Sequence, residues 1–182
     1  MTAALTLVVC GAPLAERADD VAAALVDGGW SVTVVGSPAS RGWLDVERVQ
    51  ATTGRPVLFE QRDAGESGNP RPAAVVACPL SMNSAGKAAT GIMDTYCTGV
   101  LCDALAMRLP LTVVVTVSSR LWTHPAWSGH LATFTSAGAR FVDPITGLMD
   151  QPRPVRSGSG PQLVAGFDAA ALARAVGAPG SA

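Results

Sequence analysis

Residues 75–95 read VVACPLSMNSAGKAATGIMDT, and this stretch decides the fold class. An apolar run over residues 73–78 predicts a buried strand that ends at Pro79. A polar loop over residues 79–83 follows, and a long helix is expected from there to about residue 107. A buried strand that passes through a polar loop into a helix is typical of parallel α/β sheets.

The same alternation extends to both sides of this stretch. Gly28 and Gly29 end the first predicted helix, as glycines at a helix C-terminus do. We therefore expect an α/β fold: a Rossmann-like (flavodoxin-like), doubly wound parallel sheet in three α/β/α layers, formed by one domain over residues 1–182. The other expected strands cover residues 5–10, 31–35, 111–117 and 140–142, with a brief one possible at 57–59, and the other helices cover residues 15–27, 44–51, 126–137 and 168–176.

Composition narrows the class of protein. Hydrophobic residues make up 48% and charged residues 15% of the 182 residues, which favours a homo-oligomer that buries apolar surface between subunits. A net charge of −1 gives no basic surface for nucleic acid. No apolar run reaches about 18 residues, so no membrane span is expected. The first ten residues are interpreted as a strand and not as a signal peptide, which predicts a cytoplasmic protein.

The four cysteines, Cys10, Cys78, Cys97 and Cys102, lie in apolar segments and form no C-x-x-C pair. We interpret them as buried, reduced thiols. His124 and His130 are far from them along the chain, so no metal site is expected.

The loops after the strands are the expected ligand site, because ligands bind at the carboxyl ends of parallel strands. Gly11 permits a close backbone approach before a helix N-terminus, which suits either an anion or a plain tight turn. In the next loop, Ser37 could contact a phosphate or simply cap a helix. In the third loop, Asn83 offers a donor and an acceptor to a planar edge or a carboxylate, and Lys87 can pair with an anion.

The third loop resembles a known family. Its letters Pro79-Leu80-Ser81-Met82-Asn83-Ser84, followed by Lys87, Ala89, Gly91 and Asp94, are similar to the P-A-S-A-N-T and K-x-A-x-G-x-x-D motifs of homo-oligomeric flavin-containing cysteine decarboxylases. That family includes phosphopantothenoylcysteine decarboxylase and the peptidyl-cysteine decarboxylases of peptide natural product biosynthesis. Weaker similarities lie at residues 11–15, 37–39 and 121–125, and the chain looks most like the short actinobacterial flavoproteins of this family.

The resemblance implies an FMN cofactor at a subunit contact of a homotrimer or a dodecamer of trimers. Carried over position by position, it implies cofactor-binding roles for Gly11, Ala12, Pro13, Ser37, Ala39, Pro79, Ser81, Met82, Asn83, Ser84, Lys87 and Asp94. It also implies that Asn83 and Ser118 act in catalysis, where either could hold a substrate carboxylate.

Three departures from the family bear on activity. A family His about fourteen residues before the motif falls at Gly65, where Arg62 or Asp63 could take its place. The family motif P-x-M-N corresponds to residues 115–118, so its Asn is replaced by Ser118. No cysteine follows Cys102, although phosphopantothenoylcysteine enzymes use one to reduce the enethiol.

The resemblance therefore predicts FMN-dependent oxidative decarboxylation of a cysteine-type thiol, preferably the C-terminal cysteine of a small peptide, to an enethiol. The alternatives are a flavoprotein with another redox activity, a non-catalytic regulatory flavoprotein and a relative of the prenyl-flavin synthases.

Two further segments have open interpretations. Trp122 and Trp127 flank His124 and fit subunit packing better than flavin stacking. The Pro- and Gly-rich residues 143–166 form either a flap that closes on substrate or a surface linker.

Overall fold

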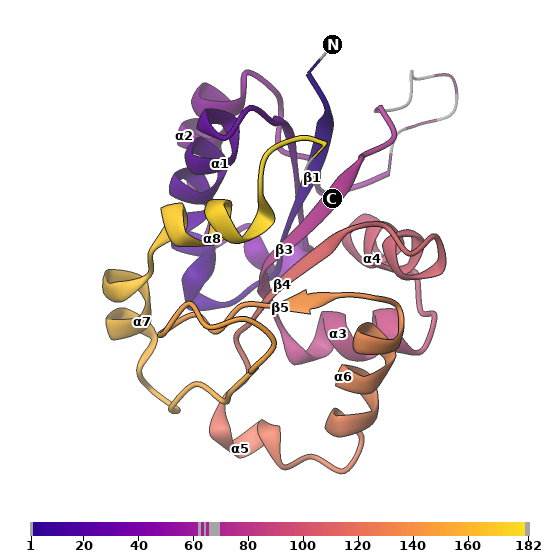
Figure 1. The fold of residues 1–182 in the computed structure, drawn as a ribbon, viewed down its shortest axis with the longest axis vertical. Coiled ribbons are helices and arrows are strands. Elements are labelled where there is room, and N and C mark those ends of the chain that lie inside the picture. Colours follow the sequence, from indigo (N-terminus) through magenta and orange to yellow (C-terminus); the bar gives the residue numbers. More distant parts are fainter. Residues whose placement is uncertain (1, 62, 64, 66–69, 181–182) are drawn as a thin grey trace.

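The sheet is parallel throughout and has five strands in the order β2-β1-β3-β4-β5. The computed structural model describes residues 2–61, 63, 65 and 70–180. This strand order confirms the flavodoxin-like α/β prediction, because β1 lies next to both β2 and β3 (Figure 1). The strands are β1 (Ala4–Val9), β2 (Ser31–Gly36), β3 (Ala74–Leu80), β4 (Leu111–Val115) and β5 (Arg140–Phe141).

Helices cover both faces of the sheet (Figure 1). One face is packed against α1 (Ala18–Asp27), α2 (Val46–Thr53) and α8 (Ala169–Val176). The other is packed against α3 (Met82–Ala89), α4 (Tyr96–Ala106) and α6 (Trp127–Ser136). Shorter elements are 3-10 turns at Pro13–Arg17 and Pro38–Ser40 and the helices α5 (Ser119–Trp122) and α7 (Gly160–Gly166). None of the helices in the described ranges is long and apolar enough to cross a membrane.

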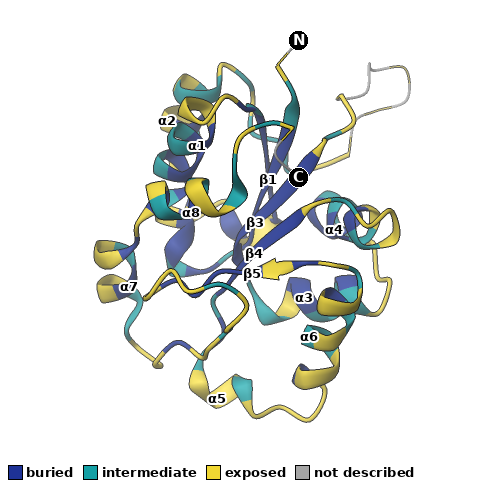
Figure 2. Cartoon of the chain, viewed as in Figure 1, coloured by how far each residue is buried: buried dark blue, intermediate teal, exposed yellow. Residues whose placement is uncertain are grey.

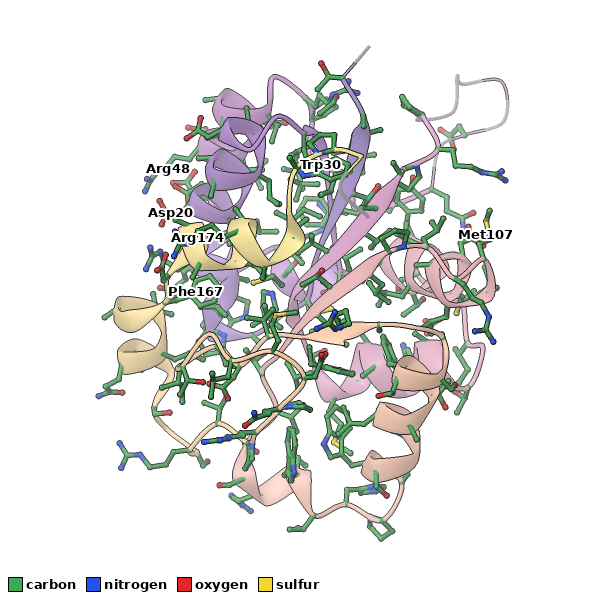
Figure 3. All side chains as sticks on the ribbon, in the orientation of Figure 1. Asp20, Trp30, Arg48, Met107, Phe167 and Arg174 are labelled. Carbon is green, nitrogen blue, oxygen red and sulfur yellow. The ribbon has the colours of Figure 1, made fainter. Side chains whose placement is uncertain are left out.

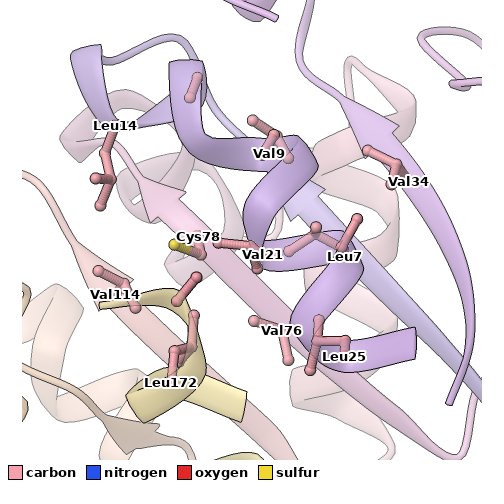
Figure 4. Packing of buried hydrophobic residues seen from close by; sticks show 14 of the residues in the cluster. Leu7, Val9, Leu14, Val21, Leu25, Val34, Val76, Cys78, Val114 and Leu172 are labelled. Carbon is pink, nitrogen blue, oxygen red and sulfur yellow. The ribbon is translucent and has the colours of Figure 1, made fainter. Parts of the chain in front are cut away.

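The central strands are apolar because both of their faces are buried. All seven residues of β3 are buried, and Figure 2 shows the central strands buried between helices whose outer sides are exposed, whereas the edge strand β5 is partly exposed. Leu7, Val76 and Leu25 belong to the cluster on the α1 side (Figure 4). Val8 and Val75 alternate with them and face α4 on the other side. A continuous apolar run, and not an alternating one, is therefore the correct signal for these strands.

The predicted helix over residues 83–107 is wrong in one respect, because it is two helices. Gly91 takes a left-handed φ of 78° just after α3. Thr95 then begins α4 with a capping box, in which its side chain accepts from the Thr98 amide and the Thr98 hydroxyl accepts from the Thr95 amide. Asp94 therefore lies in a turn and not on a helix face.

The segment over residues 143–166 is docked on the molecule. The amide of Ser119 donates to the carbonyl of Val155 at 2.9 Å, and the amide of Val155 donates to the carbonyl of Val117 at 2.9 Å. The segment ends in α7, a helix that the sequence interpretation lacks, and Leu163 of this helix is buried in the core. Closure of this segment on a substrate stays a prediction.

The C-terminal residues are fixed beside α1. The indole nitrogen of Trp30 donates to the carbonyl of Gly177 at 2.8 Å. Figure 3 shows Phe167 and Arg174 on the same side of the molecule as Asp20 and Arg48, while Met107 lies on the opposite side, on α4. Helix α8 thus completes the layer that covers β1 and β3.

Neighbouring residues of α1 test this core. Leu25 is fully buried and Val26 is 36% exposed. We expect Leu25→Ala to lower the free energy of unfolding by about 3 kcal/mol because it leaves a cavity, and Val26→Ala to lower it by less than about 1 kcal/mol. Urea unfolding followed by circular dichroism measures both. Equal losses in the two variants would contradict the packing described for α1.

Candidate functional site

A cavity of about 530 Å³ lies at the carboxyl ends of the strands. Its position is the switch point of the sheet, where the connections after β1 and β3 leave in opposite directions. The lining residues come from the loops after β1, β2, β3 and β4, from the first two turns of α3, from the start of α4 and from α5. The volume is within the ordinary range for small-molecule sites.

Most of the predicted site residues meet in this cavity. Its lining includes Gly11, Ala12, Pro13, Ser37, Ala39, Ser81, Met82, Asn83, Ser84, Lys87 and Ser118. Two predicted residues do not line it. The carbonyl of Pro79 accepts from the amide of Cys10 at 3.0 Å. Asp94 contacts the lining through Lys87 at 2.6 Å and through the hydroxyl of Thr98 at 3.5 Å.

Several lining residues were missed by the sequence analysis, namely Pro38, Trp43, Thr95, Thr98, Thr116, Val117 and Leu121. The pattern Thr95-x-x-Thr98 is a capping box, so it could have indicated a helix start, and hence a polar helix end, beside the site. Thr116 gave no such signal, because it lies in an apolar run that predicts a strand.

The loops after β1 and β2 touch each other. The amide of Gly11 donates to the hydroxyl of Ser37 at 3.1 Å. A Cβ atom at Gly11 would lie 2.6 Å from the carbonyl oxygen of Ala39, so only glycine fits here without a shift of the backbone. This close approach joins the two loops into one wall of the cavity.

The start of α3 forms the opposite wall. Ser81 caps the helix, and its hydroxyl accepts from the amide of Ser84 at 3.4 Å. Asn83 is exposed in the first turn, where backbone amides have no partner within the helix. Polar side chains and free amides at a helix N-terminus suit an anion or the polar edge of a planar ring.

Lys87 is the one charged side chain in the lining, as far as the described residues extend. Its ammonium donates to Asp94 at 2.6 Å. This hydrogen bond lowers the pKa of Asp94 below its ordinary value. The pair keeps Lys87 in place while its charge still faces the cavity.

Two thiols lie directly beneath the site. The sulfur atoms of Cys10 and Cys97 are 3.9 Å apart, and both residues are buried. The hydrogen bond from Cys97 lowers the pKa of Cys10 to about 7, against the effect of burial and with help from Ser84 and Ser81. The same hydrogen bond, together with burial, raises the pKa of Cys97. All four cysteines are free. Cys10, Cys78 and Cys97 are buried as expected, whereas Cys102 is only partly buried.

The aromatic residues near His124 pack within the chain. The rings of Trp122 and Trp127 meet edge to face with 5.4 Å between centroids, and Trp127 is 2% exposed. The preference for subunit packing is therefore wrong for Trp127, whose surroundings are its own chain. His130 lies beside Trp127, with 6.4 Å between ring centroids, and the cavity lining contains neither His124 nor His130.

The replacements considered for the family His lie elsewhere. Arg62 lies outside the described residues. Asp63 lines a different and larger cavity, of about 870 Å³, beside α4 and the middle of β1 and β2. Because that cavity lies along the side of the strands and not at their carboxyl ends, the smaller one is the better candidate site.

The residues of the smaller cavity fit a flavin. Its lining combines hydroxyls, an amide and one ammonium with apolar side chains, as a phosphate and a largely apolar ring require. The hydroxyl oxygen of Thr116 is buried and has no hydrogen-bond partner among the described residues. A polar ligand would satisfy this atom.

The fold is that of a flavodoxin-like α/β protein whose cavity fits a flavin, and comparison with known proteins gives the family. Residues 2–158 match the model of the Flavoprotein family, and the chain belongs to that family. The family confirms the prediction of a flavin cofactor and agrees with the resemblance drawn from residues 79–94.

Individual relatives are more distant. The chain is 26% identical over 147 residues to the coenzyme A biosynthesis bifunctional protein CoaBC of Thermococcus kodakarensis, which covers 77% of this chain. The match spans only 36% of the length of CoaBC.

Solved structures share the fold. The FMN-dependent cysteine decarboxylase TvaF of thioviridamide biosynthesis superposes with a TM-score of 0.69 at 20% identity, covering 79% of this chain and 91% of its own. The FMN binding protein AtHal3 superposes with a TM-score of 0.69 at 18% identity, and the match covers 91% of this chain and 94% of AtHal3. AnUbiX, solved with FMN and dimethylallyl pyrophosphate, superposes with a TM-score of 0.67 at 19% identity, and the match covers 80% of this chain and 79% of AnUbiX.

The Cys10–Cys97 pair predicts a pH-dependent stability. The folded pKa of Cys10, about 7, is below its ordinary value of 9.0, so ionisation of Cys10 stabilises the fold as the pH rises from 7 to 9, and this effect is lost as the pH falls through 7. We expect the free energy of unfolding of the wild type to rise between pH 7 and 9, and that of Cys97→Ala to rise less, because the hydrogen bond that lowers the pKa of Cys10 is lost. Urea unfolding at both pH values measures the difference.

Cys102→Ala is the matched control, because Cys102 is half-buried and bonds weakly to the Ala88 carbonyl instead. Its stability should change with pH as the wild type does. The same pH dependence in wild type and Cys97→Ala would contradict the lowered pKa of Cys10.

Proposed function

We propose that this chain is an FMN-dependent enzyme that oxidatively decarboxylates a cysteine-type thiol, preferably the C-terminal cysteine of a peptide. One observation carries the proposal: Asn83 and Ser118 line the same cavity as the loops that would hold the flavin. Cofactor and substrate groups would then meet in one site. The TvaF and AtHal3 similarities support FMN as the flavin.

The chain's own residues divide between the two ends of FMN. Ser37 and the backbone amides after Gly11 would hold the phosphate, because that wall offers donors and close backbone approach. Ser81, Asn83 and Ser84 would hold the polar edge of the ring, with Lys87 supplying a positive charge nearby.

When bound, FMN supplies a two-electron acceptor. The thiol and its neighbouring carbon lose two hydrogens to give a thioaldehyde, and loss of CO₂ then leaves an enethiol. The new carbon–sulfur double bond accepts the electron pair of the breaking carbon–carbon bond, so this second step needs no strong base. A cavity wall without carboxylate or imidazole in the described lining is compatible with such chemistry.

Asn83 and Ser118 would orient the substrate. An amide N–H and a hydroxyl can each donate to a carboxylate and keep it in place until it leaves. Ser118 offers one donor where the family Asn offers more, so we assign Asn83 the larger share.

A second candidate, a flavoprotein with another redox activity, is favoured by one observation. Neither His124 nor His130 lines the cavity, and the family Asn is replaced by Ser118. AnUbiX and AtHal3 share the fold of this chain about as closely as TvaF does, and this is compatible with another redox activity. A regulatory flavoprotein without catalysis would account for the same replacements.

We propose further that the chain assembles as a homotrimer or a dodecamer of trimers in the cytoplasm. Ile92, Met93 and Met107 are about half exposed. Met93 and Met107 line the larger cavity beside α4, and an apolar surface of this kind is suited to burial against another subunit. The free thiols agree with a reducing compartment.

Activity on peptides ending in cysteine tests the proposal. We expect mass spectrometry to detect loss of two hydrogens and CO₂ from such a peptide when it is incubated with the FMN-loaded protein. Asn83→Ala should lower kcat/KM by about 10- to 100-fold, because a hydrogen bond to a charged group is lost. Ser136→Ala, exposed on α6 and outside the cavity, should leave the rate unchanged.

Bound flavin without product from any cysteine-terminal peptide would contradict the decarboxylase and favour the second candidate. Equal rates for Asn83→Ala and the wild type would remove Asn83 from the catalytic residues.

A further inference from the structure

Thr116 has an unsatisfied hydroxyl in the candidate site. Two buried side-chain polar atoms lack a hydrogen-bond partner among the described residues, Thr116 Oγ1 and Trp127 Nε1. Of these two residues, only Thr116 lines the cavity. Buried polar atoms without a partner are rare in native proteins, so each one requires an explanation.

The sheet fixes the position of Thr116. Its amide donates to the carbonyl of Leu80 at 3.1 Å, directly beyond the last residue of β4. Val115 and Val117 on either side are 2% and 1% exposed. Val117 and Ser118, which follow, also line the cavity. The hydroxyl of Thr116 is therefore part of the rigid floor of the cavity.

An unpaired hydroxyl at this depth is costly. Leaving a buried hydroxyl unsatisfied costs about 1–3 kcal/mol, and a valine of the same shape would avoid this cost. Threonine and valine have the same branched shape, so filling this position does not by itself require a hydroxyl. Core packing therefore does not explain the threonine, whereas a ligand with a polar edge at the cavity floor does.

We propose that the Thr116 hydroxyl forms a hydrogen bond to the polar edge of the bound flavin ring and so contributes to flavin affinity. This inference rests on the proposed FMN site. A flavin ring carries carbonyl oxygens and ring nitrogens that can pair with a hydroxyl acting as donor or acceptor. We assign the bond to the cofactor and not to the substrate, because a fully buried oxygen requires a partner that stays bound between turnovers.

Three variants of the full chain test the inference, with FMN and riboflavin as probes. Thr116→Val removes the hydroxyl and keeps the shape, and Thr116→Ser keeps the hydroxyl. Thr112→Val is the matched control, because Thr112 is a buried threonine on the same strand that lies outside this cavity. Quenching of flavin fluorescence gives the dissociation constants, and thermal unfolding gives the stability of the flavin-free proteins.

Thr116→Val should bind FMN about three- to tenfold more weakly than the wild type. Riboflavin should lose affinity by the same factor, because the contact is to the ring and not to the phosphate. Thr116→Ser and Thr112→Val should stay within about twofold of the wild type. Without flavin, Thr116→Val should unfold at the same or a higher temperature than the wild type, because an unsatisfied polar atom has been removed.

A merely structural role of Thr116 would lower the stability of the flavin-free Thr116→Val protein. Weaker flavin binding by this variant with unchanged or raised stability therefore indicates a direct contact with the flavin. If Thr116→Val binds FMN as tightly as the wild type does, the inference is overturned and the proposed FMN site is unaffected. The same holds if Thr116→Ser loses as much FMN affinity as Thr116→Val. A wild-type protein that binds neither FMN nor riboflavin would overturn the proposed function and the inference together.

Discussion

The parallel pairing of β1 with β3 is the contact on which the site depends. Both strands are buried on both faces, and their register runs from Leu5 opposite Ala74 to Val8 opposite Ala77. Just beyond, the amide of Cys10 donates to the carbonyl of Pro79 at 3.0 Å. This pairing places Gly11 beside the start of α3 and sends the two connections to opposite faces of the sheet. The cavity opens where those connections separate.

Hydrogen bonding, rather than acid–base catalysis, is the chemistry this site offers. Its described lining has one charged side chain, Lys87, and that charge is paired with Asp94. Hydroxyls and an amide supply the remaining polar groups, and they can position a cofactor and a carboxylate without exchanging protons at neutral pH. Such a site suits a reaction in which a bound flavin accepts two electrons and an adjacent carbon–sulfur double bond accepts the electron pair of the breaking carbon–carbon bond.

The sequence predicts the layers of this fold because its strands are continuous apolar runs and its helices end at glycines. It places the loop after β3 only approximately, because β3 continues through Pro79 to Leu80 and α3 begins at Met82, so the loop predicted over residues 79–83 shrinks to Ser81. It fails at Gly91, where a helical composition hides a left-handed turn, and at residues 160–166, where Pro161 and two glycines conceal a helix that packs through Leu163. Thr116 could not be found, because a threonine in a strand pattern gives no sign that its hydroxyl lacks a partner.

The absorbance spectrum of the purified protein, with mass identification of the chromophore that it releases, tests the central claim most directly. The account predicts flavin absorption bands and a released molecule with the mass of FMN. A colourless protein that also takes up no added FMN would contradict the assignment of the β1/β3 cavity as a flavin site. The loops around Gly11 and Asn83 would then need another ligand or a purely structural explanation.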